Sequence, residues 1–215
     1  MGQAVTYLFD PLCGWCYGAA PALDRLRRAG VALRTAPTGL FSGEGARRMD
    51  AAFASFAWTS DQRIARMTGQ VFSERYRDTV LADRGCLFDS GPATLALSAV
   101  ASVEPDREFE ALKALQAARY VEGLDITATP VLRAVLETQG LGWAAEAAAK
   151  AGPALLERHR LRIAQARGTM SLLGASGVPT LVVGQGAQAR LLPTGMLFGP
   201  PEQLTQHLAA AGAGG

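Results

Sequence analysis

Two of the three cysteines in the chain are separated by only two residues, in the tetrapeptide Cys13-Gly14-Trp15-Cys16. This C-x-x-C spacing is typical of dithiol redox pairs, and three cysteines cannot build the disulfide framework that holds small secreted domains together. In such a pair one thiolate attacks a disulfide and the second thiol resolves the mixed disulfide. The spacing therefore favours redox chemistry over structural cross-linking.

The alternatives for these two thiols are a half zinc site or two buried thiols without chemistry. The chain has no second C-x-x-C pair, and only Cys86, His159 and His207 could complete a set of four ligands, at spacings that match no zinc motif. We therefore predict no metal here. Cys86 could be a further resolving thiol, but a small buried or incidental loop cysteine is the more common case.

The residues around the pair predict the elements that position it. Residues 3–9 form a short apolar and β-branched run that breaks at Asp10-Pro11, which indicates a buried strand and a turn. Over residues 15–28 apolar side chains recur at steps of three and four, which predicts an amphipathic helix ended by Gly30. Cys13 then opens that helix, where unpaired N–H groups and the helix dipole stabilise a thiolate. Cysteines in such positions have pKa values of about 3.5–7.5.

The remaining chain predicts an α/β sheet interrupted by helices. Residues 31–36 alternate like a second strand, and strand patterns return at 180–183 and 189–192, followed by a closing helix over 201–210. Between about 41 and 173 the chain is rich in Ala, Leu, Arg, Glu and Gln, which predicts several helices and no strand. We expect the tail, residues 211–215, to be disordered.

A second motif, Gly177-Val178-Pro179-Thr180, places a proline at the first position of the predicted strand 180–183. Proline there donates no ladder hydrogen bond and is a candidate for a cis peptide bond. The thioredoxin architecture has two halves. One half is strand-helix-strand and carries C-x-x-C, and the other is strand-strand-helix and is preceded by Val-Pro. The predicted thioredoxin-like domain is discontinuous, residues 1–40 and 175–215, with a helical insertion domain at 41–174.

Residues 9–18 (FDPLCGWCYG), with Pro21 shortly after, resemble the active-site signature of cytoplasmic DsbA-like proteins, a family of predicted dithiol-disulfide isomerases. Residues 177–180 are similar to that family's cis-proline loop, and residues 41–174 to its inserted helical domain. The resemblance implies a thioredoxin-like fold with a large all-helical insertion. It also implies a protein disulfide oxidoreductase in which Cys13 is the nucleophile and Cys16 the resolving thiol, with no cofactor beyond this pair.

The same resemblance implies how a substrate binds. Pro179 is expected in cis beside the cysteines, and the Val178 main chain would pair with an extended, disulfide-containing protein or peptide, or meet a small thiol. Trp15 would contact substrate, and glutathione is a possible co-substrate. Asp10 could transfer protons near Cys16, although an Asp before a Pro is also ordinary turn chemistry.

Two other functions fit parts of the pattern. A glutathione-dependent transferase or isomerase of the kappa-class-like group resembles this layout, but those proteins usually carry serine where Cys13 stands and lack the second cysteine. A peptide-binding module without redox turnover would use only the Val178-Pro179 edge. The C-x-x-C pair argues against both.

Charge and hydropathy limit the partners. The formal net charge is +2 over 215 residues, with Lys and Arg scattered along the chain, which makes nucleic acid a poor candidate. No apolar run approaches the roughly 20 residues of a membrane span, and the first ten residues show no secretory signal pattern. We therefore expect a cytoplasmic protein with no membrane partner.

Overall fold

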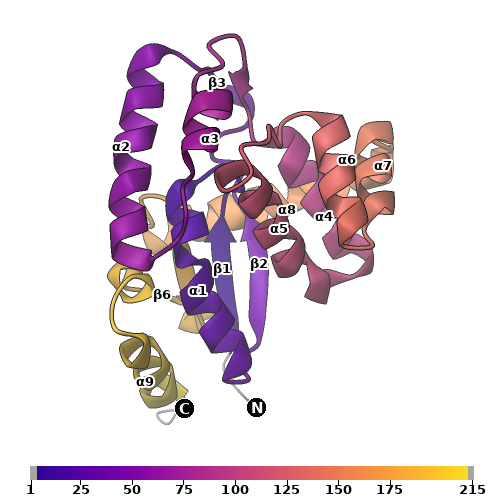
Figure 1. The fold of residues 1–215 in the computed structure, drawn as a ribbon. Coiled ribbons are helices and arrows are strands. Elements are labelled where there is room, and N and C mark those ends of the chain that lie inside the picture. The colour runs from indigo at the N-terminus through magenta and orange to yellow at the C-terminus, as the bar shows by residue number, and fades with distance from the viewer. Residues whose placement is uncertain (1–3, 213–215) are drawn as a thin grey trace.

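A computed structural model describes residues 4–212 and has a four-stranded sheet at its centre (Figure 1). Its strands are β1 (Val5–Phe9), β2 (Leu33–Pro37), β5 (Thr180–Val183) and β6 (Arg190–Leu192), in the order β2-β1-β5-β6. Strand β1 runs parallel to β2 and antiparallel to β5, and β6 is antiparallel to β5. The two ends of the chain therefore build one sheet, as the sequence predicts.

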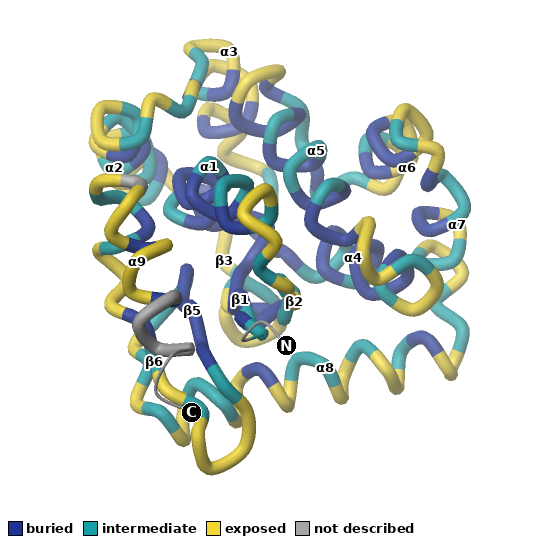
Figure 2. The backbone as a smooth tube through the Cα atoms, turned by 90° about the horizontal axis from the view of Figure 1, so that it is seen from below, coloured by how far each residue is buried: buried dark blue, intermediate teal, exposed yellow. Residues whose placement is uncertain are grey.

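Helices cover both faces of this sheet, α1 (Gly14–Arg28) on one face and α8 (Pro153–Leu173) on the other (Figure 2). Successive side chains of a strand point to opposite faces. Tyr7 accordingly lies in the buried cluster that includes α1, whereas Leu8 packs with Ala166 of α8. Because β1 is buried on both faces, its sequence is almost continuously apolar.

The other helices lie mainly between β2 and β5 in the chain. Helices α1, α2 and α5 lie side by side, and α4 to α7 form a group beside β2 (Figure 1). The bounds are α2 (Ala51–Thr68), α3 (Glu74–Tyr76), α4 (Gly91–Val103), α5 (Glu108–Tyr120), α6 (Thr129–Thr138), α7 (Gly142–Lys150) and α9 (Pro201–Gly212). Residues 211 and 212, expected to be disordered, end α9, and residues 213–215 lie outside the described residues.

The prediction of no strand between 41 and 173 was wrong at two short segments. Strand β3 (Arg47–Arg48) pairs antiparallel with β4 (Leu87–Phe88). Two residues are too few for an alternating pattern to appear in the sequence. Tertiary contacts hold this pair instead, because the Phe88 ring packs on Phe41 and Phe53, with ring centroids 4.9 and 5.0 Å apart.

Helix α8 joins the sheet to the helical group. Arg162 of α8 forms an ion pair with the buried Glu108 of α5, with nitrogen and oxygen 2.7 Å apart. It also donates a hydrogen bond to the Thr35 carbonyl of β2 at 3.2 Å. The division of the chain into residues 1–40 with 175–215 and an insertion at 41–174 stays a prediction. No helix within residues 4–212 is both long enough and apolar enough to cross a membrane.

Candidate active site

Cys13 occupies the N-cap of α1. Its backbone is extended, with φ −83° and ψ 114°, and no side chain caps the helix. The first turn of α1 contains no acidic residue. The amide groups of that turn have no acceptor within the helix, so the positive end of the helix dipole is directed toward this position.

The loop before β5 comes next to Cys13 because β5 is the antiparallel neighbour of β1, with Leu8 opposite Thr180. The end of β1 and the start of β5 therefore lie at the same edge of the sheet. The Cys13 thiol donates a hydrogen bond to the Val178 carbonyl, with Sγ and oxygen 3.6 Å apart. The Val178–Pro179 peptide bond is cis. The structure thus brings together the two motifs that lie far apart in the sequence.

The two thiols have different surroundings. Cys16, one turn further along α1, is 1% exposed, and the Tyr7 hydroxyl donates a hydrogen bond to its carbonyl at 3.1 Å. Burial raises the pKa of the Cys16 thiol well above its ordinary value, the neighbouring Cys13 raises it further, and the Tyr7 hydroxyl lowers it. Cys16 is therefore the buried, protonated member of the pair. Sequence reasoning missed Tyr7, which has the pattern of an ordinary core residue.

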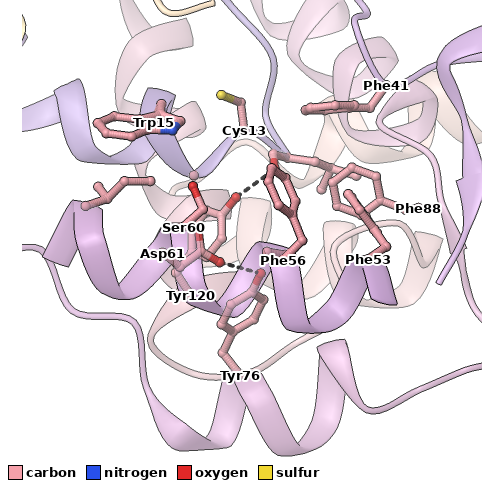
Figure 3. Close-up of a pocket in the computed structure, with 14 residues that line it drawn as sticks. Cys13, Trp15, Phe41, Phe53, Phe56, Ser60, Asp61, Tyr76, Phe88 and Tyr120 are labelled. Carbon is pink, nitrogen blue, oxygen red and sulfur yellow. Dashed lines mark hydrogen bonds between the residues drawn. The ribbon is translucent and has the colours of Figure 1, made fainter. Parts of the chain in front are cut away.

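A cavity of about 110 Å³ lies beside Cys13. Aromatic side chains supply much of its wall, and Figure 3 shows Cys13 between Trp15 and Phe41, with Asp61 and Tyr76 on the opposite side. The polar side chains that line it are Ser60, Asp61, Tyr76 and Tyr120. Cys13 is 6% exposed and lines this cavity.

Asp61 is the acidic residue of the cavity wall and was not predicted. It lies on the buried face of α2 with Ala54 and Ile64, and its Oδ2 accepts a hydrogen bond from the Tyr76 hydroxyl at 3.1 Å. Burial raises the pKa of Asp61 to about 7, against the opposing effects of Tyr76 and Arg119. Its carboxyl group therefore changes charge near neutral pH.

Arg119 of α5 lies behind three of the aromatic side chains of the cavity. It is 1% exposed, and its guanidinium lies 5.4 Å from the ring centroids of Tyr76 and Phe88 and 5.8 Å from that of Tyr120. Among the described residues, its Nε and Nη2 have no hydrogen-bond partner. The rings thus hold this buried cation near Asp61.

The Asp10 carboxylate connects three segments. It accepts hydrogen bonds from the Leu12 amide at 2.9 Å, the Phe41 amide at 3.1 Å and the Ser90 hydroxyl at 2.7 Å. Burial raises the pKa of Asp10, and these three bonds lower it. Within residues 4–212 no hydrogen bond joins the carboxylate to Cys16. Its proton-transfer role stays a prediction, whereas its place in the turn is visible.

Trp15 and Cys86 occupy different surroundings. Trp15 is half-buried, lines the cavity and packs edge-on against Phe198, with ring centroids 5.1 Å apart. Cys86 is a free, partly buried thiol in the loop before β4 that does not line the cavity, and burial raises its pKa.

In the described part of the chain, His, Cys, Asp and Glu side chains form no group of three or more that could hold a metal.

A C-x-x-C pair at a helix start, a Val-Pro loop beside it and this sheet order together define a thiol–disulfide oxidoreductase of the thioredoxin-fold class. A family model described as the DSBA-like thioredoxin domain matches residues 4–209, and the chain belongs to this family. The predicted thioredoxin-like fold is confirmed, as is an enzyme that exchanges disulfides through a redox-active cysteine pair.

Solved structures include similar proteins. The cytosolic disulfide reductase DsbM from Pseudomonas aeruginosa is 33% identical, with a TM-score of 0.84 over 97% of this chain and 98% of DsbM. The same protein solved with GSH is 34% identical, with a TM-score of 0.82 and the same coverage. A structure from Nitrosomonas europaea shares the fold at 23% identity, with a TM-score of 0.81 over the full length of both chains. A comparison with curated proteins finds no match.

Proposed function

We propose that this oxidoreductase works in the cytoplasm as a disulfide reductase or isomerase, with Cys13 as nucleophile and Cys16 as resolving thiol. The observation that carries the proposal is the asymmetry of the pair. Cys13 occupies the N-cap position of α1 and borders the cavity, whereas Cys16 lies one turn further along the helix, is buried and has a raised pKa. An entering disulfide meets Cys13 first.

The two steps follow from this arrangement. The Cys13 thiolate attacks one sulfur of the substrate disulfide, so that a Cys13–substrate bond forms and the other substrate sulfur leaves. Cys16 then loses its proton and attacks the Cys13 sulfur, which closes the Cys13–Cys16 disulfide and releases the second substrate thiolate.

Substrate binding would use the Val178 loop. In the described part of the chain no hydrogen bond uses the Val178 amide N–H, and the carbonyl is bonded only to the Cys13 thiol. Both main-chain groups could therefore pair with an extended peptide beside the nucleophile, as in strand addition. Trp15 would form an apolar contact at the same site.

Glutathione is the small thiol that the comparisons favour. DsbM has been solved with GSH and is 34% identical to this chain over nearly its full length. In a glutathione-buffered cytosol disulfides are scarce, so exchange would run mainly toward reduction or isomerisation. The cavity beside Cys13 gives a small disulfide room to approach the sulfur.

Insulin reduction by three serine variants tests these roles. Cys13→Ser should abolish turnover, and Cys16→Ser should accumulate a mixed disulfide detectable by mass spectrometry. Cys86→Ser is the matched control, because this thiol lies outside the cavity, and it should keep wild-type activity. Full activity in Cys13→Ser would overturn the proposed function.

A further inference from the structure

Asp61 and Cys13 line the same cavity (Figure 3). The Tyr76 hydroxyl occupies Oδ2 of Asp61, while Oδ1 packs against the backbone of Gly14, next to the nucleophile. No hydrogen bond within residues 4–212 uses Oδ1. A sulfur atom in this cavity would therefore find one unoccupied carboxyl oxygen close to Cys13.

We propose that Asp61 donates the proton that the leaving sulfur takes up when Cys13 attacks a disulfide. The inference rests on the proposed function, in which Cys13 is the nucleophile. In this step the Cys13–sulfur bond forms and the substrate disulfide breaks, with its electron pair going to the leaving sulfur. The Asp61 carboxyl transfers its proton to that sulfur, so a neutral thiol and a carboxylate result, and the carboxylate regains a proton from solvent.

The charged and titratable groups around Asp61 suit this role. Tyr76, which follows α2 in the chain, donates to Oδ2, and the buried Arg119 of α5 supplies a positive charge. Tyr120 of α5 and Cys13 at the N-cap of α1 line the same cavity. Burial outweighs Tyr76 and Arg119, and the pKa of about 7 leaves both forms of Asp61 available near neutral pH.

The proposal predicts a specific pH dependence. The protonated carboxyl is the active form, so its contribution is full below pH 7 and is lost as the pH rises above it. Only the thiolate form of a cysteine attacks a disulfide. The informative quantity is therefore the single-turnover rate constant for thiol release, divided by the thiolate fraction measured from thiolate absorbance.

The main test compares Asp61→Asn with wild type between pH 5.5 and about 9, using glutathione disulfide as substrate. Wild type should show a corrected rate that falls around pH 7, and Asp61→Asn should show a flat profile. Below pH 7 the variant should be slower by about tenfold. This loss is smaller than the 10²–10⁴ typical of general acids because thiolates leave readily.

Two further variants separate proton transfer from other effects. Asp78→Asn is the matched control, because Asp78 is an exposed carboxylate paired with Arg77 at 2.7 Å on the segment after Tyr76, and it should keep the wild-type profile. Tyr76→Phe removes a hydrogen bond that lowers the pKa of Asp61, so the inflection should move to higher pH.

The outcomes are distinct. If Asp61→Asn changes the thiolate fraction alone and leaves the corrected profile unaltered, Asp61 acts only through its charge, and the proposal is wrong. An inflection that Tyr76→Phe does not move would also overturn it. In either case an inactive Cys13→Ser would leave the proposed function standing.

Discussion

A Cβ atom on residue 14 would overlap Oδ1 of Asp61, so the glycine between the two cysteines leaves room for this side chain of α2. Gly14 lies in the first turn of α1 and is not among the glycines with positive φ. Packing, and not backbone conformation, therefore explains why glycine stands here.

Substituting Gly14 tests this packing. Gly14→Ala should lower the free energy of unfolding by about 1–3 kcal/mol, the usual cost of overpacking. The same change in an Asp61→Ala background should cost much less, because the obstacle has been removed. Denaturant unfolding of the four proteins in this double-mutant cycle measures the coupling.

Gly168→Ala is the matched control, since a Cβ at that position in α8 meets nothing within 4 Å. Alanine is favoured over glycine inside a helix, so this variant should gain up to about 1 kcal/mol. Equal losses at both glycines would argue against a specific contact with Asp61.

The pH dependence of stability provides a second prediction about Asp61. Its folded pKa of about 7 lies above the unfolded value near 3.9, so the folded state binds its proton more tightly. Asp61 therefore weakens the fold progressively as the pH rises from about 4 to 7, and by a constant amount above that range. Three pKa units correspond to about 4 kcal/mol, an upper figure for this site.

Urea unfolding of wild type and Asp61→Asn at several pH values measures this effect. The stability of the variant relative to wild type should increase from pH 4 to pH 7 and then level off. Asp50 is a control in which the pH dependence of stability has the opposite sign, because the hydrogen bond from the Phe53 amide lowers its pKa. Its contribution to stability should be lost as the pH falls, and a flat difference for Asp61→Asn would contradict the raised pKa.

Tyr7→Phe should slow the resolving step. The Tyr7 hydroxyl lowers the pKa of Cys16, so its removal raises that pKa further and leaves less Cys16 thiolate. A loss of about 1 kcal/mol, typical of one hydrogen bond, would lengthen the lifetime of the mixed disulfide about fivefold. Acid quenching and mass spectrometry measure that lifetime. The rate of the first attack serves as the internal control, and an unchanged lifetime would exclude this role.

The ion pair between Arg162 and Glu108 should matter for stability and not for chemistry. Arg162→Met leaves the Glu108 carboxylate buried without its charged partner, which typically costs about 3–5 kcal/mol. Arg160→Met is the matched control, because its pair with Glu157 is exposed and 4.0 Å long, and it should cost less than about 1 kcal/mol. Thermal unfolding distinguishes the two variants. Similar melting temperatures would show that the buried pair does not hold α8 in place.

The sequence predicted the elements that follow a local pattern. The apolar run of β1, the periodic face of α1 and the strand β5 lie where the residue patterns place them, within one or two residues. Local patterns placed the C-x-x-C pair after one predicted strand and the Val178-Pro179 loop before another. That the two motifs meet was implied by the resemblance to DsbA-like proteins and not by the local patterns.

The polar wall of the cavity could not be predicted in the same way. Asp61 is followed in the sequence by Gln62 and Arg63, which is typical of a solvent-exposed helix face. The packing of α2 against Gly14 and Tyr76 buries it. A signal was present, since Asp61 lies seven residues after the buried Ala54 and three before the buried Ile64, on one helical face.

Helix α2 forms part of the cavity wall, and its residue Asp61 packs against Gly14 of the redox tetrapeptide. The position of α2 therefore affects both the size of substrate that can enter and the supply of a proton by Asp61. A bulky folded protein that displaces α2 to reach Cys13 would carry Asp61 away from the sulfur, whereas a small disulfide that slips in beneath α2 would keep it. The enzyme should consequently favour compact disulfides by kinetics, even where both kinds of substrate are equally reducible.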